Sequence, residues 1–270
     1  MIAAHRLLAA SLVTAFMLIP VVWLVATSLK PPGEYVATSA RLWPDTVTLE
    51  HYRALWADGA GQRFVNSVVV TLGTTLMALA IAFPAAYALA RLDFPRRLDV
   101  AFLALVLVVK LLPPIAVAIP LFQVLRELGL LDTRAGLVLA YQVYALPFAI
   151  WMLLGYVRDV PLAVEEAAAI DGAGLGRRLV TIVLPMTAPG LVATGVFVAV
   201  LAWNEFLFAL LFIQTPSLFP LPTYIATMIT EDETLWGPLM ALGALASLPV
   251  ILATGLVTRW LTRGFLGGMD

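Results

Sequence analysis

The chain has 270 residues, of which 62% are hydrophobic and 12% charged, and its formal net charge is -1. A soluble domain carries roughly a quarter charged residues, so this composition excludes an ordinary soluble protein and favours a membrane protein. The near-zero net charge gives no basis for a nucleic-acid partner. There is no cysteine and there are only two histidines, so we expect no thiol nucleophile, no metal site and no catalytic residues.

Nucleotide-binding motifs are also missing from the sequence. The only lysines are Lys30 and Lys110, and neither follows the glycine pattern of a phosphate-binding loop. The glycines at 172, 174 and 176 are no dinucleotide fingerprint, because no strand precedes them. Any ATP would therefore be hydrolysed by another chain.

Apolar runs dominate the sequence, and a helix needs about 20 apolar residues to cross a bilayer. Six runs qualify: residues 7–29, 64–90, 100–119, 135–156, 188–213 and 239–261. The first run could be a signal peptide, but it is too long, and we interpret it as an uncleaved span. The predicted fold is an all-α membrane protein of six transmembrane helices. Prolines inside the runs predict kinks rather than breaks: Pro84, Pro113, Pro114, Pro147 and Pro249.

The basic residues between the runs predict the orientation. Nine Lys and Arg residues fall on the side of the termini and six on the other, and the segment 214–238 has none. Because cytoplasmic loops are enriched in Lys and Arg, we expect both termini in the cytoplasm.

We expect one transmembrane domain, residues 1–270. It comprises a first span with an outer segment (1–63), a five-helix core (64–260) and, within that core, a cytoplasmic loop (157–187). Residues 30–63 are either a folded cap on the outer surface or a solvated connection. We find no internal repeat.

The cytoplasmic loop carries the most informative residues. Asp159 can cap a helix with Pro161 in its first turn, the alanine run 167–169 favours that helix, and Gly172 ends it. A second short helix can run over residues 175–184. Glu165, Glu166 and Asp171 offer acceptors to Arg or Lys on a partner, and small alanines allow a close approach, so the loop has the form of a docking element.

The run 166–173, Glu-Ala-Ala-Ala-Ile-Asp-Gly-Ala, followed by Leu184-Pro185, resembles the EAA loop of ABC-importer permeases. The resemblance implies the binding-protein-dependent importer permease fold and a loop that couples to a separate ATPase. The implied coupling residues are Glu165, Glu166, Ala167, Ala168, Asp171, Gly172, Ala173, Leu184 and Pro185. The form of the loop, with the runs 64–67, 87–91 and 203–206, is similar to the carbohydrate branch, the maltose- and glycerol-phosphate-type permeases. The residues 267–270 depart from that branch, which leaves any contact of the tail with the ATPase in doubt.

The same resemblance implies the partners and the cofactors. A homologous second permease, a cytoplasmic ATPase dimer and an extracytoplasmic substrate-binding protein are expected, with ATP and Mg bound by the ATPase and no cofactor in this chain. The chain would then be a non-catalytic, multi-pass subunit in the plasma membrane of a prokaryote. It would form half of the path for a sugar or related carbohydrate.

Two further groups carry open alternatives. Asn204 and Glu205 lie inside an apolar run, where they could line the path of the solute or pair with the partner subunit. The flanking Trp203 and Phe206 could stack on a sugar ring or simply pack. The segment 214–238 contains three consecutive acidic residues: Glu231, Asp232 and Glu233. The segment resembles the loop that reaches toward the binding protein in the carbohydrate branch. The alternative is a solvated acidic loop.

An alternative function from another class is a secondary transporter or channel. That function calls for intramembrane ionisable groups or broken helices at matched positions of two repeats. Glu205 and Lys110 alone do not make such a pattern, so the importer subunit is the expected function.

Overall fold

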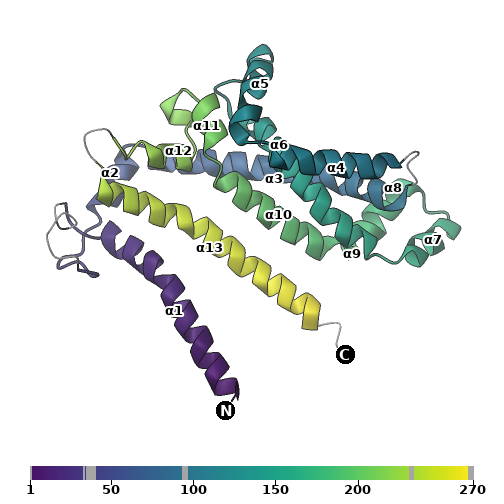
Figure 1. Ribbon diagram of the computed structural model, residues 1–270, viewed down its shortest axis with the longest axis horizontal. Coiled ribbons are helices and arrows are strands. Elements are labelled where there is room, and N and C mark those ends of the chain that lie inside the picture. The colour runs from purple at the N-terminus through teal and green to yellow at the C-terminus, as the bar shows by residue number, and fades with distance from the viewer. Residues whose placement is uncertain (1, 33, 35–40, 93–96, 231–233, 267–270) are drawn as a thin grey trace. The chain divides into compact units, whose positions relative to one another are not determined.

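The structure is a computed structural model that describes residues 2–32, 34, 41–92, 97–230 and 234–266 (Figure 1). Within these ranges every regular element is a helix, apart from one isolated antiparallel bridge between Ile229 and Thr234. This result confirms the predicted all-helical class. The chain divides into two compact units, Met1–Phe64 with Leu221–Ile251 and Val65–Pro220 with Leu252–Asp270.

In the first unit, polar contacts around Lys30 join the segment after α1 (Ile2–Ser28) to α1 and α2 (Glu50–Ala57). The unit also contains α12 (Leu221–Ala226) and the start of α13 (Trp236–Leu266). The buried Lys30 ammonium donates to the Arg41 carbonyl at 2.6 Å and lies 5.0 Å from the Trp23 ring centroid. The His51 ring lies 2.8 Å from the Lys30 carbonyl. The segment after α1 is therefore folded against its neighbours at these points.

A second cluster in the same unit joins α12 to the segment after α2. The Tyr224 hydroxyl donates to the Asp58 carboxylate at 2.6 Å, and the Arg63 guanidinium lies 4.1 Å from the Tyr224 ring centroid. Burial, together with the hydrogen bond to Asp58, raises the pKa of Tyr224 to about 12. The folded-cap alternative for residues 30–63 agrees with these contacts.

The second unit contains the helices between α2 and α12, and α6 (Arg134–Arg158) packs against three of them. The others are α3 (Ala60–Arg91, from Val65 on), α4 (Leu98–Leu111), α5 (Pro114–Glu127), α7 (Leu162–Ile170), α8 (Leu175–Arg178), η3 (Leu179–Val183), α9 (Leu184–Met186), α10 (Ala188–Trp203), α11 (Leu207–Phe212) and η4 (Pro216–Leu218). Helices α4 and α10 contact α6, and α11 contacts both α5 and α6.

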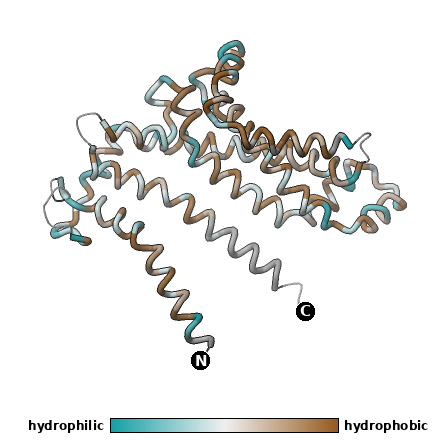
Figure 2. Tube along the Cα trace, viewed as in Figure 1, coloured by the Kyte–Doolittle hydropathy of each residue, from teal (hydrophilic) through white to brown (hydrophobic). Residues whose placement is uncertain are grey.

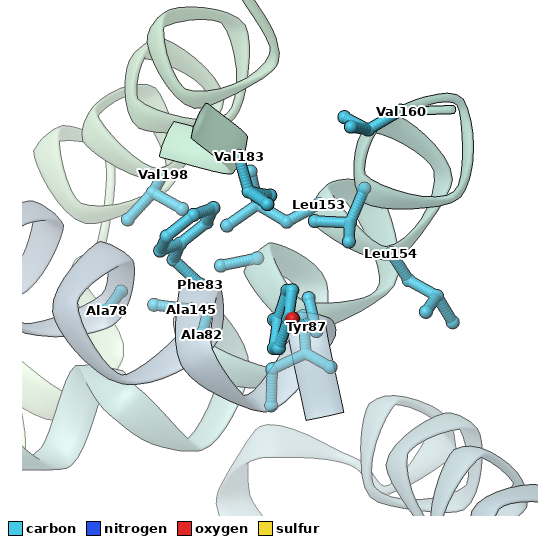
Figure 3. Close-up of a cluster of buried hydrophobic side chains, with 14 residues drawn as sticks. Ala78, Ala82, Phe83, Tyr87, Ala145, Leu153, Leu154, Val160, Val183 and Val198 are labelled. Carbon is cyan, nitrogen blue, oxygen red and sulfur yellow. The ribbon is translucent and has the colours of Figure 1, made fainter. Parts of the chain in front are cut away.

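Small residues allow the helices of this unit to approach closely. Figure 3 shows side chains of α3, α6 and α10 gathered with Val183, including the fully buried Ala78, Ala82 and Val198. Close backbone approach through small residues is the usual basis of helix association in membranes, where lipid is as apolar as the interface. The aromatic ring of Tyr87 lies in the same cluster, near the end of α3.

Four described helices are long and apolar enough to cross a bilayer, and a fifth span results if the bent pair Leu175–Met186 and Ala188–Trp203 is counted as one. Their apolar runs appear brown in Figure 2. The chain is thus a multi-pass membrane protein.

The expected third span, residues 100–119, is not one helix. Helix α4 ends at Leu111 and α5 begins at Pro114, with Leu112 and Pro113 in extended conformations. A proline disfavours the helical conformation of the residue before it, so two consecutive prolines break the helix. The prediction of a kink is wrong here. Pro84, Pro147 and Pro249 lie inside α3, α6 and α13, so the helices are not broken at these positions, as expected.

Asp132 fixes the end of α11 to the turn between α5 and α6. The backbone N–H groups of Gln214 and Thr215 donate to its carboxylate at 2.9 Å, the Thr215 hydroxyl donates as well, and Asp132 N–H donates to the Phe212 carbonyl. The bonds from Thr215 stabilise the charged form and lower the pKa of Asp132 below its usual value. The carboxylate therefore contributes stability above its ordinary pKa, and this contribution is lost as the pH falls through the lowered value.

The start of α6 generates a stability prediction. Thr133 caps the helix by accepting from Gly136 N–H at 2.9 Å, and a Cβ on Gly136 would lie 2.1 Å from the Leu130 carbonyl oxygen. We expect Gly136→Ala to lower the thermal unfolding midpoint in detergent by roughly 3 to 10 °C, because the backbone must shift. On the same helix, nothing lies within 4 Å of a Cβ on Gly155. Gly155→Ala is the matched control and should not lower the midpoint. Equal midpoints for the two variants would contradict the prediction.

Candidate functional site

The loop predicted to carry the function folds as a helix, a glycine turn and a second helical segment. Helix α7 ends at Ile170, and Gly172 follows with a φ of +83°, a conformation that favours glycine. The N–H groups of Gly172 and Ala173 donate to the carbonyls of Ala169 and Ala168 at 3.0 and 2.9 Å. The predicted role of Gly172 as the turn glycine is confirmed.

The start of α7 differs from the prediction. Asp159 is the residue at the C-terminal end of α6, where its N–H donates to the Gly155 carbonyl, and Pro161 rather than Asp159 precedes α7. Pro161 has an extended conformation and makes no side-chain cap. Helix α6 extends further than expected, to Arg158. Asp159 is therefore the C-cap residue of α6 and not the N-cap residue of α7.

The Glu165 side chain of the loop is buried and forms an ion pair with Arg91. Its carboxylate is 1% exposed and accepts hydrogen bonds from Tyr87 Oη at 2.8 Å and from Arg91 Nε at 2.8 Å, both at the end of α3. Arg91 also donates to the carbonyls of Val157 and Val160 at 2.9 and 2.6 Å. These bonds join α7, the end of α6 and the end of α3, and we call this group the Glu165 clamp.

The burial of Glu165 corrects one expectation. The sequence suggested that Glu165 offers its carboxylate to a partner, but the clamp already uses both of its oxygens. An ion pair that is buried in this way costs about 3–5 kcal/mol if one partner is removed, because the other charge stays buried without compensation. The clamp therefore fixes the position of α7 against α3.

The other face of α7 is open. Glu166, Ala167 and Asp171 are exposed, and Ile170 keeps 87% of its accessible surface. Exposed apolar residues next to acidic ones fit a surface that another protein covers. Ala168 and Ala173 are half-buried.

The second part of the loop leads into α10 through a bend. Helix α8, η3 and α9 follow one another from Leu175 to Met186, as expected for residues 175–184, and the chain then turns by 75° into α10. Thr187 at the bend is buried, and its hydroxyl donates to the Val183 carbonyl at 2.8 Å. Leu184 packs against the core cluster, whereas Pro185 is exposed.

Sequence reasoning missed the roles of Tyr87 and Arg91. The sequence showed both only as the ends of the run 87–91 that closes an apolar segment. A basic residue at the last turn of a helix is usually explained by the helix dipole and by the orientation of the chain. The partner of Arg91 lies 74 positions away, so no local pattern could have revealed it.

The residues 203–206, which the sequence placed inside an apolar run, lie where α10 ends and α11 begins. Trp203 is buried, Asn204 is exposed and donates to the Val200 carbonyl at 2.8 Å, and Phe206 is 37% exposed. The Glu205 carboxylate accepts from the N–H groups of Phe208 and Ala209 at 2.8 and 3.3 Å. Glu205 therefore caps α11, a role that the sequence did not predict. The acidic residues Glu231, Asp232 and Glu233 lie outside the described residues.

Comparison with known families gives one match over most of the chain. The model of the family described as "Binding-protein-dependent transport system inner membrane component" matches residues 79–267. This range includes α7, the glycine turn, the bend and residues 203–206.

Several curated proteins are similar over nearly the whole length. The trehalose transport system permease protein SugB of Mycobacterium tuberculosis is 35% identical over 262 residues, 96% of this chain and 94% of that protein. The sulfoquinovosyl glycerol transport system permease protein SmoH of Agrobacterium fabrum is 33% identical over 97% of this chain and 92% of its own length. The trehalose/maltose transport system permease protein MalG of Thermococcus litoralis is 30% identical over 97% of this chain and 94% of that protein.

Solved structures share the fold. A bacterial ABC transporter involved in the import of the acidic polysaccharide alginate matches with a TM-score of 0.79, at 20% identity, over 95% of this chain and 96% of that chain. The MetNI methionine ABC transporter matches with a TM-score of 0.61, at 16% identity, over 80% of this chain and 99% of that chain.

The Glu165 clamp generates a prediction. We expect Arg91→Met to destabilise the protein by about 3 kcal/mol, because Glu165 would stay buried without its cation. Arg91→Met combined with Glu165→Leu should cost less than Arg91→Met alone. The thermal midpoint in detergent and the rate of trypsin cleavage after the exposed Arg177 measure the effect.

The control for this series is Arg158→Met, which changes an exposed arginine at the end of α6. It should leave both readouts near the native values. The clamp would be refuted by an Arg91→Met protein that behaves like the Arg158→Met protein.

Proposed function

The chain belongs to the family of binding-protein-dependent transport system inner membrane components, and we propose that it is the permease subunit of an ATP-driven carbohydrate importer, coupled to its ATPase through α7. As a family member it is a permease of an ABC transporter, a membrane component and not an enzyme. The carbohydrate class and the coupling role are the parts that we propose.

The observation that carries the coupling proposal is the two-sided character of α7. One side is fixed to α3 and α6 by the buried Glu165 clamp, and the other exposes Glu166, Ile170 and Asp171. A rigid element between an exposed docking face and the transmembrane helices transmits a displacement instead of absorbing it. Closure of an ATPase dimer on α7 would therefore move α3 and α6 with it.

The partners follow from the family and from the residues of this chain. We propose a second, homologous permease, because one chain of this size forms half of a path. The ATPase dimer would bind ATP and Mg, and Glu166 and Asp171 would accept hydrogen bonds from its Arg or Lys side chains. A substrate-binding protein would deliver the solute. In a related alginate transporter structure, a periplasmic protein is part of the complex.

The carbohydrate class rests on the relatives. The names of three similar permeases assign them to trehalose, to trehalose and maltose, and to sulfoquinovosyl glycerol. These molecules share several hydroxyl groups, and we propose a solute of that kind. The outer contact would come from the segment with Glu231, Asp232 and Glu233, and the path would pass Trp203, Asn204, Glu205 and Phe206. No feature of the described residues favours a secondary transporter or channel.

We further propose the complete topology. Six spans with both termini in the cytoplasm of a prokaryote would place α7 and the glycine turn on the side of ATP, and residues 30–63 outside. Nine basic residues on the side of the termini, against six on the other, support this orientation. The residues 64–260 would then form the permease core and 157–187 its coupling loop.

The test of the coupling role is a double change on the open face of the loop. In nanodiscs with the ATPase, the second permease and the binding protein, Gly172→Asp with Glu166→Lys should still assemble. Binding-protein-stimulated ATP hydrolysis should fall at least about tenfold, the loss of roughly 1.4 kcal/mol of coupling, because the turn is strained and a contact charge is reversed.

The matched control makes the same two chemical changes at the turn after α5. Gly129 also has a positive φ, +66°, with nothing within 4 Å of a Cβ, and Glu127 is exposed like Glu166. Gly129→Asp with Glu127→Lys should keep the native stimulation. Stimulation that survives in the Gly172 and Glu166 variant would reduce the loop to an ordinary connector.

A further inference from the structure

A cavity of about 350 Å³ lies beside the break between α10 and α11. Its polar wall comes from the helices α3 and α6 and from the break itself: Thr74, Tyr141, Tyr144, Asn204 and Glu205. Most of the remaining wall is apolar. A mainly apolar cavity with a few convergent polar groups is the usual form of a small-molecule site, and its volume is near the lower end of the range of about 300–1,000 Å³.

The hydroxyl groups of this wall are buried without hydrogen-bond partners among the residues that the structure describes. This holds for Thr74 Oγ1, Tyr141 Oη and Tyr144 Oη, and the neighbouring Gln142 Oε1 is in the same state. Tyr141 is 4% exposed, and its hydroxyl lies beside the Glu205 carboxylate without a regular hydrogen bond to it. Buried polar groups are nearly always satisfied, so a group of them at one cavity indicates a missing partner.

The surroundings hold these groups in place. The Tyr144 ring stacks on Phe208 with centroids 5.7 Å apart, and Phe208 stacks on Phe212 at 5.4 Å. Backbone N–H groups of α11 fix the Glu205 carboxylate. These contacts hold the Tyr144 ring and the Glu205 carboxylate in place at the cavity wall.

We propose that this cavity is a subsite for one unit of a polyhydroxylated solute, with Tyr141, Tyr144 and Thr74 as its hydrogen-bonding residues. The proposal rests on the proposed carbohydrate importer and adds that this subunit touches the solute itself. Each hydroxyl of the wall can donate and accept, as each hydroxyl of a sugar can, and Glu205 can accept. The apolar remainder of the wall suits the faces of a sugar ring.

The absence of cysteine from the chain allows a direct test of occupancy. In the assembled complex in proteoliposomes, Asn204→Cys places a single thiol of this chain at the cavity wall. Its rate of reaction with a small methanethiosulfonate reagent is read on this chain by mass spectrometry, with and without trehalose as the probe. We expect trehalose to slow the reaction at least fivefold.

Two changes localise the effect to the hydroxyls. Tyr141→Phe with Tyr144→Phe removes two oxygens and keeps both rings, and we expect this pair to abolish the protection. Tyr156→Phe, on the same helix, should keep it. A thiol at the exposed Thr181, in η3, should react at the same rate with and without trehalose.

Trehalose uptake, measured on the same vesicles, separates the two proposals. Uptake without protection would overturn the subsite and leave the carbohydrate function standing. Protection without uptake would leave the subsite standing and count against the function. Protection that persists in the Tyr141 and Tyr144 variant would show that these hydroxyls only bind water, and would overturn their assignment.

Discussion

The buried carboxylate of Glu165 is the constraint on which the α7 end of the second unit depends. Taking this charge out of water is costly, and Tyr87, Arg91 and the two carbonyls held by Arg91 compensate it only while α3, α6 and α7 keep their mutual positions. Moving α7 alone would separate the charges in a low dielectric. The three helices therefore behave as one body at this end, and the exposed face of α7 is attached to the membrane core through side chains and not only through the chain itself.

Much of the fold follows from the sequence, because lipid leaves few solutions. Composition and apolar runs predict an all-helical membrane protein, and prolines such as Pro84 and Pro147 lie inside helices without ending them, as expected. The breaks were harder to predict. Pro113 and Pro114 act together where each alone would only kink, and the break at residues 204–206 has no proline at all. There a glutamate supplies the cap of a new helix, which hydropathy cannot show.

The parts of the candidate site that depend on residues close together in the sequence were predictable. The helix over the alanine run and the turn at Gly172 depend on propensity and on one positive φ, both legible over a few residues. The clamp joins residues 74 positions apart, and the cavity hydroxyls of Thr74, Tyr141 and Tyr144 come from two helices. Such groups are ordinary members of apolar runs in the sequence. Only the packing of the helices shows that Glu165 is buried while its neighbour Glu166 is exposed.

The distance between α7 and α3 during the ATP cycle tests most directly whether the Glu165 clamp is rigid. The chain has no cysteine, so spin labels at Leu92→Cys and Ile170→Cys, both exposed positions, are the only labels on it. The distance distribution would be recorded by pulsed electron paramagnetic resonance in the assembled transporter without nucleotide and with trapped ATP. A rigid clamp predicts one narrow distribution that is the same in both states. A shift of several ångströms, or a broad distribution in either state, would contradict it.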